Sequence, residues 1–426
     1  MINQISKMSE EYNLKGNNPN SEVLTREVLE SFGNKVLLVD RDEESNLDLF
    51  CYIKCLDKDP ELLKQCRGVV FHDSEIVLRG FPYIPEWNDT EKDTIEKLLV
   101  DNFGSYKFFD SHEGALIRVF NFNGKWYVST HRKLNAYRSK WASKESFGTM
   151  FSNALEAEYV INENFRERIE NPKSDNDDDS ILTKFVRTLE PDKKYMFLIR
   201  NTTQNRIVSE APRRATIYHV GTFVGEKLTF NNFVDLPYPR EHKFTSTTKL
   251  IDFVHNIDAN SLQGVIIFAP NNKQYKILNK NYQELFNVRG NEPSIKFRYL
   301  QIRLDLQATD NLYGLYPDKA DIFDDYENTI YEIAKHINKA YVDRYIKKLF
   351  VTVPKEEYHI MSTLHEWHIN DRKRNRISFQ KVMDVINEQT PTFLNHMIRK
   401  AKTSKMTESS VEIPHLLPRP STNENN

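Results

Sequence analysis

Alternating apolar and polar positions dominate the first 300 residues and predict a series of short strands. Strand-like runs fall between 35 and 130, and they resume between 194 and 279. Within the first group, two alternating runs flank Asn123 and Gly124, which favour the left-handed conformations of a tight hairpin turn. The pattern predicts an α+β domain of mostly antiparallel sheets.

From about residue 320 the apolar period changes to 3.6, which is typical of helices. One apolar face runs through 322–349, and shorter helices are expected at 355–369, 378–389 and 392–400. The α+β domain is therefore followed by an α-helical C-terminal domain. The predicted organisation is a disordered N-terminus at 1–22, the α+β domain at 23–310, the helical domain at 320–402 and a flexible tail at 403–426.

Composition narrows the class of protein. Three cysteines without CxxC spacing exclude a disulfide scaffold and a structural zinc module, so a reducing compartment is expected. The chain has no apolar run near 18 residues, which excludes a membrane partner, and its polar start does not resemble a signal peptide. With 59 basic and 61 acidic residues, the net charge of −2 excludes a uniformly basic nucleic-acid binder.

Charge is nevertheless uneven along the chain. Residues 340–405 hold 13 Lys or Arg and 7 Asp or Glu, a local excess of six positive charges. The run at 371–376 is either a solvated turn or a patch that contacts phosphates. The candidate residues for contact with an RNA backbone are Arg372, Lys373, Arg374 and Arg376.

Histidines in the helical region do not form a recognisable metal motif. LHEWHIN at 364–370 lacks HExxH spacing because Ile369 stands where the second histidine is needed. His365 and His368 are expected to pack or cap, and no metal site is predicted.

Four segments carry a resemblance to a known family. They are QCRGVVF at 65–71, DSHEGALIRVF at 110–120, FLIRNTTQNRIV at 197–208, and LQGVIIF at 262–268 with QYKIL at 274–278. In this order they resemble the RNA ligases of the phage type, a branch of the covalent nucleotidyltransferases, over about residues 60–300. The resemblance implies a nucleotidyltransferase (RNA ligase-like) fold for 23–310. In that family a lysine attacks the nucleotide α-phosphate, and the lysyl-AMP then donates its nucleotide to a 5′-phosphate end.

The matching positions depart from the family at each catalytic group. Ser111 stands in place of the lysine, and Ile199 and Gln263 stand in place of two glutamates. Of the two lysines in the last motif, Lys276 matches one, while the other position holds Gln274 or Leu278, depending on the register. Because nucleophile and metal-binding carboxylates are needed together, these losses predict a catalytically inactive centre without a cofactor.

Although the cleft is expected to be catalytically inactive, it is still expected to bind a ligand. The partner implied by the resemblance is an RNA 5′ end or a nucleotide, held without Mg²⁺, because two carboxylates that would repel phosphate are gone. The helical domain is expected to follow the RNA backbone or recruit a protein partner. The candidate residues for nucleotide or phosphate binding are Arg67, Glu113, Gly114, Arg132, Asn205, Arg206 and Lys276.

Two alternatives stay open. One is an active RNA ligase or guanylyltransferase that uses ATP or GTP with Mg²⁺ and a displaced lysine, for which Lys107 is the nearest candidate on the same strand. The other is a structural or virion scaffold protein that has kept only the fold. The composition and the divergent motifs resemble proteins of large cytoplasmic DNA viruses, which implies a location in the host cytoplasm or the virion.

Overall fold

The structure is a computed structural model that describes residues 23–99, 103–171, 179–202, 207–231, 233–270 and 273–411, with side chains up to 403. The chain divides into two compact units, Met1–Glu284 and Leu285–Asn426. The helical unit thus begins earlier than the predicted 320. The predicted disordered segment 1–22 lies outside the described residues.

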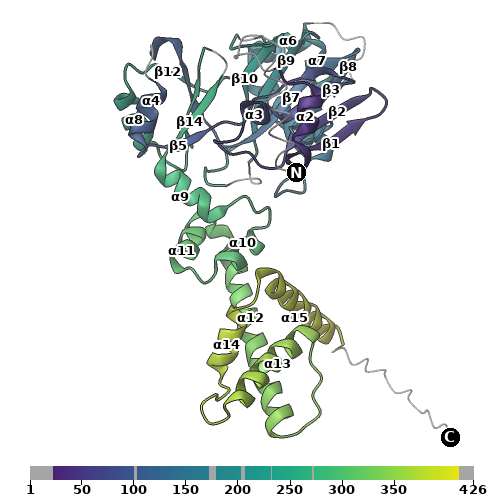
Figure 1. Ribbon diagram of the computed structural model, residues 1–426. Helices are drawn as coiled ribbons and strands as arrows, with labels where there is room; N and C mark the ends of the chain where they lie inside the picture. Colours follow the sequence, from purple (N-terminus) through teal and green to yellow (C-terminus); the bar gives the residue numbers. More distant parts are fainter. Residues whose placement is uncertain are drawn as a thin grey trace, which may run out of the picture. The chain divides into compact units, whose positions relative to one another are not determined.

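The N-terminal unit contains three sheets (Figure 1). The first has the order β1-β2-β3-β4 and comprises Val36–Asp42, Leu47–Tyr52, Arg67–His72 and Glu75–Leu78. The second has the order β11-β10-β9-β7-β8 and comprises Lys227–Thr229, Thr216–Val224, Lys193–Arg200, Ala115–Phe122 and Lys125–Ser129. The third has the order β12-β6-β13-β14-β5 and comprises Glu241–His242, Lys107–Ser111, Gly264–Phe268, Gln274–Leu278 and Glu86–Asn88. Pairing is antiparallel except between β14 and β5.

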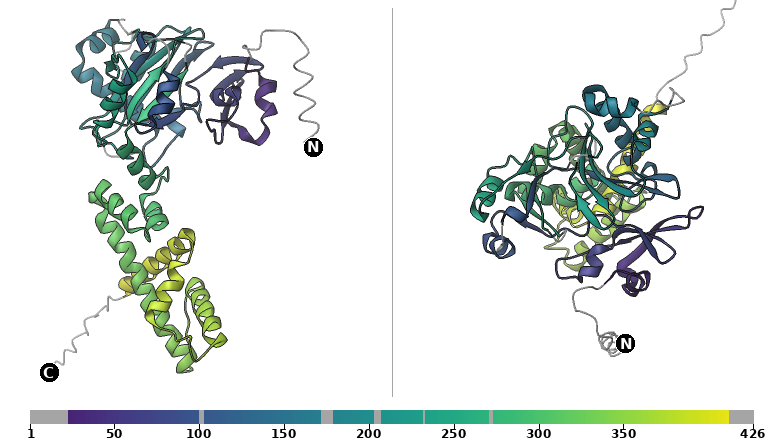
Figure 2. Two further views of the ribbon diagram at one scale, coloured as in Figure 1. Left: turned by 60° about the vertical axis from the view of Figure 1, so that its left-hand side comes forward. Right: turned by 90° about the horizontal axis from the view of Figure 1, so that it is seen from above.

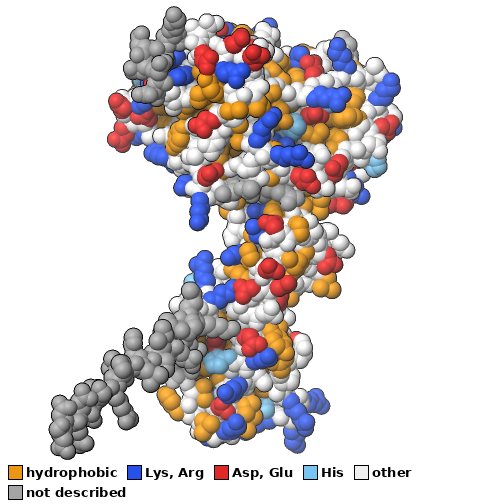
Figure 3. Space-filling view, turned by 180° about the vertical axis from the view of Figure 1, so that it is seen from behind, with side chains coloured by type: hydrophobic (Ala, Val, Ile, Leu, Met, Phe, Trp, Pro, Cys, Tyr) orange, Lys and Arg blue, Asp and Glu red, His pale blue; other side chains and the backbone are white. Residues whose placement is uncertain are grey.

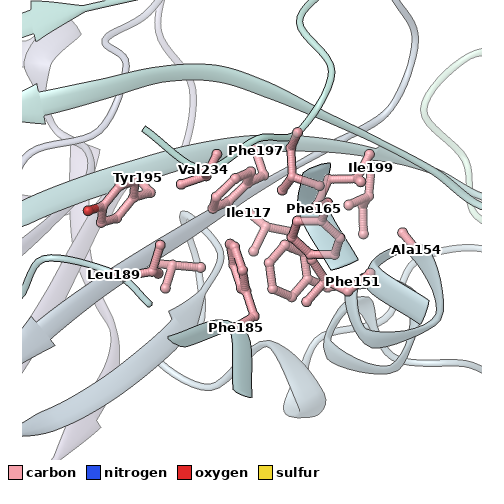
Figure 4. Close-up of a cluster of buried hydrophobic side chains, with 14 of the residues drawn as sticks. Ile117, Phe151, Ala154, Phe165, Phe185, Leu189, Tyr195, Phe197, Ile199 and Val234 are labelled. Carbon is pink, nitrogen blue, oxygen red and sulfur yellow. The ribbon is translucent and has the colours of Figure 1, made fainter. Parts of the chain in front are cut away.

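Helices cover the outer faces of these sheets. Helices α5, α6 and α7 pack on the second sheet through a core rich in phenylalanine (Figure 4). Helices α4 and α8 cover the third sheet through Ile95, Leu250 and Val254. The first sheet and its helices α2 and α3 lie to one side of the other two sheets (Figure 2). These helices are α2 Arg26–Ser31, α3 Glu61–Gln65, α4 Lys92–Leu98, α5 Phe147–Ile161, α6 Glu163–Glu170, α7 Ile181–Arg187 and α8 Thr247–His255.

A shared core joins the inner faces of the sheets. Phe109 and Phe268 from the third sheet pack in one cluster with Phe120 and Met196 from the second and Val70 from the first. Alternation along a strand therefore divides each one between this core and a helix-covered face. This division decides which side chains reach the inner surface where the candidate residues lie.

The C-terminal unit is helical. Its long helix α12 buries Phe323, Ile330 and Ile337 along one stripe and contacts α13, α14 and α15. Helix α9, Lys280–Arg289, crosses the boundary between the units. The other helices are α10 Ile295–Ile302, α11 Leu306–Leu315, α12 Ala320–Tyr341, α13 Lys355–Asn370, α14 Phe379–Asn387 and α15 Pro391–Val411. Short 3₁₀ turns occur at Gly33–Lys35, Phe103–Ser105, Ala136–Arg138 and Pro317–Lys319, and a π-helical turn follows α12 at Val342–Ile346.

The predicted fold class, an α+β domain of mostly antiparallel sheets followed by helices, is confirmed. The hairpin is present between β7 and β8, with φ of 50° at Asn123 and 82° at Gly124. Two details differ. Residues 207–210, within the range where strand-like runs were expected, have no strand pairing, and helix α15 continues to Val411, past the predicted start of the tail at 403.

Candidate functional site

Strand pairing brings together the two positions that departed most clearly from the ligase pattern. Ser111 ends β6 and pairs in register with Gly264, the first residue of β13. The Ser111 hydroxyl donates a hydrogen bond to Oε1 of Gln263 at 3.1 Å, and the Gln263 backbone N–H donates to the Ser111 carbonyl at 2.9 Å. Ser111 is buried. A hydroxyl and an amide therefore meet, and both are neutral.

The hydrogen bonds continue through a residue that the sequence did not indicate. Nε2 of Gln263 donates to the Tyr282 hydroxyl at 2.9 Å, and that hydroxyl donates to Oε2 of Glu113 at 3.1 Å. Burial, reinforced by the neighbouring Glu113 carboxylate, raises the pKa of Tyr282, so its hydroxyl stays protonated. Four side chains, from β6, the loop after β6, the residue before β13, and α9, thus form one hydrogen-bonded chain.

Glu113 is directed at the protein's own backbone. Its carboxylate accepts hydrogen bonds from the backbone N–H groups of Ile207, of Val208 at 2.9 Å and of Ser209 at 3.0 Å. The carboxylate therefore fixes the described end of the loop after β9. Asn205 and Arg206, which were predicted to bind phosphate, belong to the same loop but lie outside the described residues.

Gly114 is explained by packing. A Cβ atom at this position would lie 2.6 Å from the Ile199 carbonyl oxygen and 3.0 Å from the Leu198 side chain. Strands β7 and β9 therefore approach closely here, and only glycine fits without a shift of the backbone.

The position assigned to Ile199 needs correction. Its side chain lies in the core beneath α5–α7, beside Phe151 and Phe165 (Figure 4), on the face turned away from the other sheets. Alternation places Leu198 and Arg200 on the inner face instead. Neither is a carboxylate, so the inner face of this strand end lacks one in either register.

Lys276 lies on the same face of the third sheet as Ser111, but in the neighbouring row of paired residues. It pairs with Ile266, whereas Leu278 pairs with Gly264 and so lies in the row of Ser111. Gln274, Lys276 and Leu278 all lie on this face, so the two registers left open both remain. Nζ of Lys276 lies 2.7 Å from a carboxylate oxygen of Glu86 on β5.

A group of basic side chains gathers where β3 and β7 approach. Arg118 on β7 is only 1% exposed and donates hydrogen bonds to the backbone carbonyls of Gly68 and, at 2.6 Å, Thr130. Its Nε has no partner among the described residues. Burial, with a smaller contribution from the neighbouring Arg67, lowers the pKa of Arg118 to about 9, so the guanidinium remains charged at neutral pH.

Arg67, His131 and Arg132 complete this group, hereafter the arginine cluster. Burial, followed by Arg67, Arg118 and Arg132, lowers the pKa of His131 to about 3, so its ring is neutral. Within the described part of the chain, none of the three arginines forms an ion pair with a carboxylate. Three positive charges therefore lie together with no carboxylate partner among the residues that the structure describes.

The structure thus distributes the predicted residues over two places. Arg67 and Arg132 belong to the arginine cluster, and Ser111, Glu113 and Gln263 to the hydrogen-bonded chain. Sequence reasoning missed Tyr282, Arg118 and His131. One signal was available, because Arg118 is a lone cation within the apolar strand ALIRVF.

Two residues near Ser111 in the sequence, His112 and Lys107, have side chains that contact other residues. The His112 ring stacks on Tyr218 with centroids 4.5 Å apart, and burial lowers its pKa to about 4. Lys107 begins β6, four residues from Ser111, and its ammonium lies 3.3 Å from the Glu241 carboxylate. Four residues of strand span about 13 Å.

In the helical unit, the basic run lies in the turn between α13 and α14. Arg372, Lys373, Arg374 and Arg376 are all exposed, and Arg374 lies 3.8 Å from Asp371. The face shown in Figure 3 mixes basic and acidic side chains over both units, so such runs stand out only locally.

The histidines of α13 have structural partners. The His365 ring stacks on the Tyr345 ring with centroids 3.8 Å apart, and Nδ1 of His368 lies 2.6 Å from the Asn375 carbonyl oxygen. The described residues contain no group of three or more His, Cys, Asp or Glu side chains placed to hold a metal ion. Among the described helices, none has the length and apolarity that a membrane span requires.

Comparisons with known proteins give viral relatives. No family model matches the chain. It is 30% identical over 379 residues to the "Immediate-early protein ICP-46 homolog" of Invertebrate iridescent virus 6, covering 83% of this chain and 80% of that protein. It is 21% identical over 226 residues to the "Putative bifunctional polynucleotide kinase/RNA ligase" of Autographa californica nuclear polyhedrosis virus, covering 51% of this chain and 30% of that protein.

Among solved structures, an archaeal ATP-dependent RNA ligase aligns with 69% of this chain and 70% of its own. The sequence identity is 14% and the TM-score is 0.37.

Proposed function

The chain belongs to the family of immediate-early protein ICP-46 homologues, and from this premise we propose that it is a catalytically inactive RNA-ligase-like protein that binds RNA 5′ ends or nucleotides. The motifs in ligase order and the similarity to a viral protein named as an RNA ligase support the nucleic-acid part of the proposal. The arrangement of the inner surface supports the inactive part.

The single observation that carries the proposal is the hydrogen bond between Ser111 and Gln263. Nucleotidyl transfer to a side chain needs a nucleophile that can be deprotonated. The Ser111 hydroxyl donates to an amide oxygen, which is not a base at neutral pH, and His112 is stacked on Tyr218 instead. Gln263 also lacks the charge with which a carboxylate would hold a divalent metal.

Phosphate binding is assigned to the arginine cluster. Arg67, Arg118 and Arg132 together provide charge and N–H donors, and guanidinium groups match the geometry of phosphate oxygens. Since no carboxylate of the described residues pairs with these groups, an anion is proposed to gain the full attraction without a bridging metal. Binding is therefore proposed to be independent of Mg²⁺.

The helical unit is proposed to extend the contact. The exposed Arg372, Lys373, Arg374 and Arg376 would follow the RNA backbone, which adds affinity without base selectivity. Recruitment of a protein partner by this unit, and a site of action in the host cytoplasm or the virion, are parts of the same hypothesis.

The first experiment tests catalysis. The full-length protein is incubated with α-labelled ATP or GTP and Mg²⁺, and the expected result is the absence of a covalent protein–nucleotide band. A band that disappears in Lys107→Ala would overturn the inactive assignment and support the displaced-lysine alternative.

The second experiment tests binding. Short RNAs with a 5′-triphosphate, 5′-monophosphate, cap or 5′-hydroxyl are titrated at two salt concentrations, with EDTA present. Phosphorylated ends are expected to bind more tightly than the hydroxyl end, and Arg67→Ala to weaken them roughly tenfold. The control is Arg240→Ala, an exposed arginine outside the cluster. Equal affinity for all ends would favour the scaffold alternative.

A further inference from the structure

A second pocket lies in the N-terminal unit, away from Ser111. It encloses about 750 Å³ and is lined by residues of α3, β4, β5, β14, the start of β9 and the β10–β11 turn. Gln274, in its wall, begins β14 opposite Phe268, whereas Leu278 ends β14 in the row of Ser111. Four residues of strand, about 13 Å, separate the two positions. The pocket is therefore distinct from the surroundings of Ser111.

The walls of this pocket are rich in flat aromatic rings. Tyr83, Trp87, Phe223 and Tyr275 all line it. Phe223 pairs in register with Lys194 and shares its sheet face, whereas the rings of Trp87 and Tyr275, with centroids 5.8 Å apart, pack beneath α4 and α8 on the face of the third sheet opposite to Gln274. Partly exposed aromatic rings in a cavity offer stacking surfaces, and every nucleobase has a π-face that can use them. The shape and the lining thus favour a planar aromatic ligand.

One buried polar group in the pocket lacks a partner. Gln274 is 3% exposed, and its Oε1 makes no hydrogen bond to any described residue. A buried amide oxygen without a donor is unfavourable, and native proteins satisfy nearly all such groups. A ligand with a ring N–H or an exocyclic amine would supply the missing donor. Nucleobases carry both kinds of group.

One cation of the pocket is also unmatched. Lys194 on β9 is half-buried, and its ammonium forms no ion pair with a carboxylate of the described residues. The other basic groups differ, since Lys64 lies 2.8 Å from Glu61 and Arg79 lies 3.8 Å from Glu226. An anionic group on the ligand would form an ion pair with the Lys194 ammonium.

We propose that this pocket binds a nucleotide. The base lies against Tyr83 and Phe223 with its edge on Gln274, and the phosphate reaches Lys194. The pocket adjoins the arginine cluster at Gly80 and Pro82, where Arg67 donates a hydrogen bond to the Pro82 carbonyl at 3.3 Å. The groups proposed to hold the ligand, Gln274 and Lys194, are not part of that cluster, so the proposal goes beyond binding of RNA 5′ ends. A nucleotide of this chemistry comes from one of two sources, a free nucleoside monophosphate or an unpaired nucleotide within single-stranded RNA.

The test uses the full-length protein and two probes: the four ribonucleoside monophosphates, and short single-stranded RNAs with a 5′-hydroxyl, which lack the group proposed for the arginine cluster. Lys194→Gln is compared with Lys193→Gln, the same change at the next residue, whose ammonium pairs with Glu190 and lies 4.0 Å from the Phe233 ring centre. Gln274→Leu removes the amide at nearly constant volume, and a thermal melt checks that each variant folds.

Lys194→Gln is expected to weaken binding about tenfold, and Lys193→Gln less than twofold. Gln274→Leu is expected to reduce the difference in affinity among the four bases. If the monophosphates bind, the ligand is a free nucleotide. If only the RNAs bind, the ligand is an unpaired nucleotide within single-stranded RNA. The proposal is overturned if neither probe binds, or if Lys194→Gln and Lys193→Gln have equal effects. Because Lys194 is outside the arginine cluster and the probes lack a 5′-phosphorylated RNA end, an unchanged response to Lys194→Gln is a failure of this proposal, whereas an unchanged response of phosphorylated RNA ends to Arg67→Ala is a failure at the 5′-end site.

Discussion

Arg118 gives the sharpest test of phosphate binding, because a buried cation without a carboxylate is costly unless an anion joins it. Burial lowers the pKa of Arg118 from 12.5 to about 9, which corresponds to a cost of about 5 kcal/mol for keeping the charge in place. The substitution Arg118→Met removes this cost and preserves much of the apolar volume. It also removes the donors to the Gly68 and Thr130 carbonyls, at about 1–3 kcal/mol for each acceptor left unsatisfied.

The two effects oppose each other and are similar in size. Without an anion, the free energy of unfolding of Arg118→Met is therefore expected within about 2 kcal/mol of the wild type. Tripolyphosphate is expected to stabilise the wild type, by about 2.7 kcal/mol at a concentration 100 times the dissociation constant. The variant is expected to lose most of this gain.

Urea unfolding, with and without tripolyphosphate at constant ionic strength, measures both quantities. Arg240→Met applies the same chemical change at an exposed arginine and is expected to keep the anion-dependent gain. The reasoning is refuted if Arg118→Met loses more than about 4 kcal/mol without anion while tripolyphosphate stabilises both proteins equally. The role of Arg118 would then be structural, through its hydrogen bonds to the Gly68 and Thr130 carbonyls.

Three further predictions concern the surroundings of Ser111. Tyr282→Phe removes the hydroxyl in the middle of the hydrogen-bonded chain, and is expected to lower the free energy of unfolding by about 1–3 kcal/mol in urea titrations; no change would mean that the chain contributes nothing to stability. Gly114→Ala is expected to lower the melting temperature because its Cβ would meet backbone at 2.6 Å, whereas Gly314→Ala, where nothing lies within 4 Å, is expected to leave it unchanged or raise it. Since the pKa of His112 falls from 6.5 to about 4, the unfolded chain binds this proton first as pH falls, so up to about 3 kcal/mol of stability is lost between pH 6.5 and 4. His112→Phe should flatten that part of the stability–pH curve, and an unchanged curve would contradict the assignment.

Local sequence signals predicted much of the fold. The Asn123–Gly124 turn and the change of apolar period near 320 both correspond to observed elements, because turn chemistry and amphipathic spacing act over a few residues. The sequence motif placed Ile199 at a glutamate position of the ligase pattern, but its side chain lies in the core beneath α5–α7, and a shift of one residue in a strand exchanges the two faces. The motif match alone did not fix the register at that precision.

The site was predictable only where its residues belong to motifs. Ser111 and Gln263 were each identified by a motif, and the β6–β13 register brings them into contact. Tyr282 and His131 join through long-range packing, for which periodicity provides no signal. Charge counting missed Arg118, since a single cation in an apolar strand does not change a local net charge.

The Ser111–Gln263 hydrogen bond also bears on how this surface can change in evolution. A lysine introduced alone at 111 would place its ammonium in a buried position against a neutral amide. A glutamate introduced alone at 263 would bring a second carboxylate to the Tyr282 hydroxyl, which already donates to Glu113. Each single step toward a ligase-type centre is therefore unfavourable, and only the paired change creates a salt bridge. The two residues are expected to be exchanged together across relatives, so that the neutral pair is a state that single mutations do not readily leave.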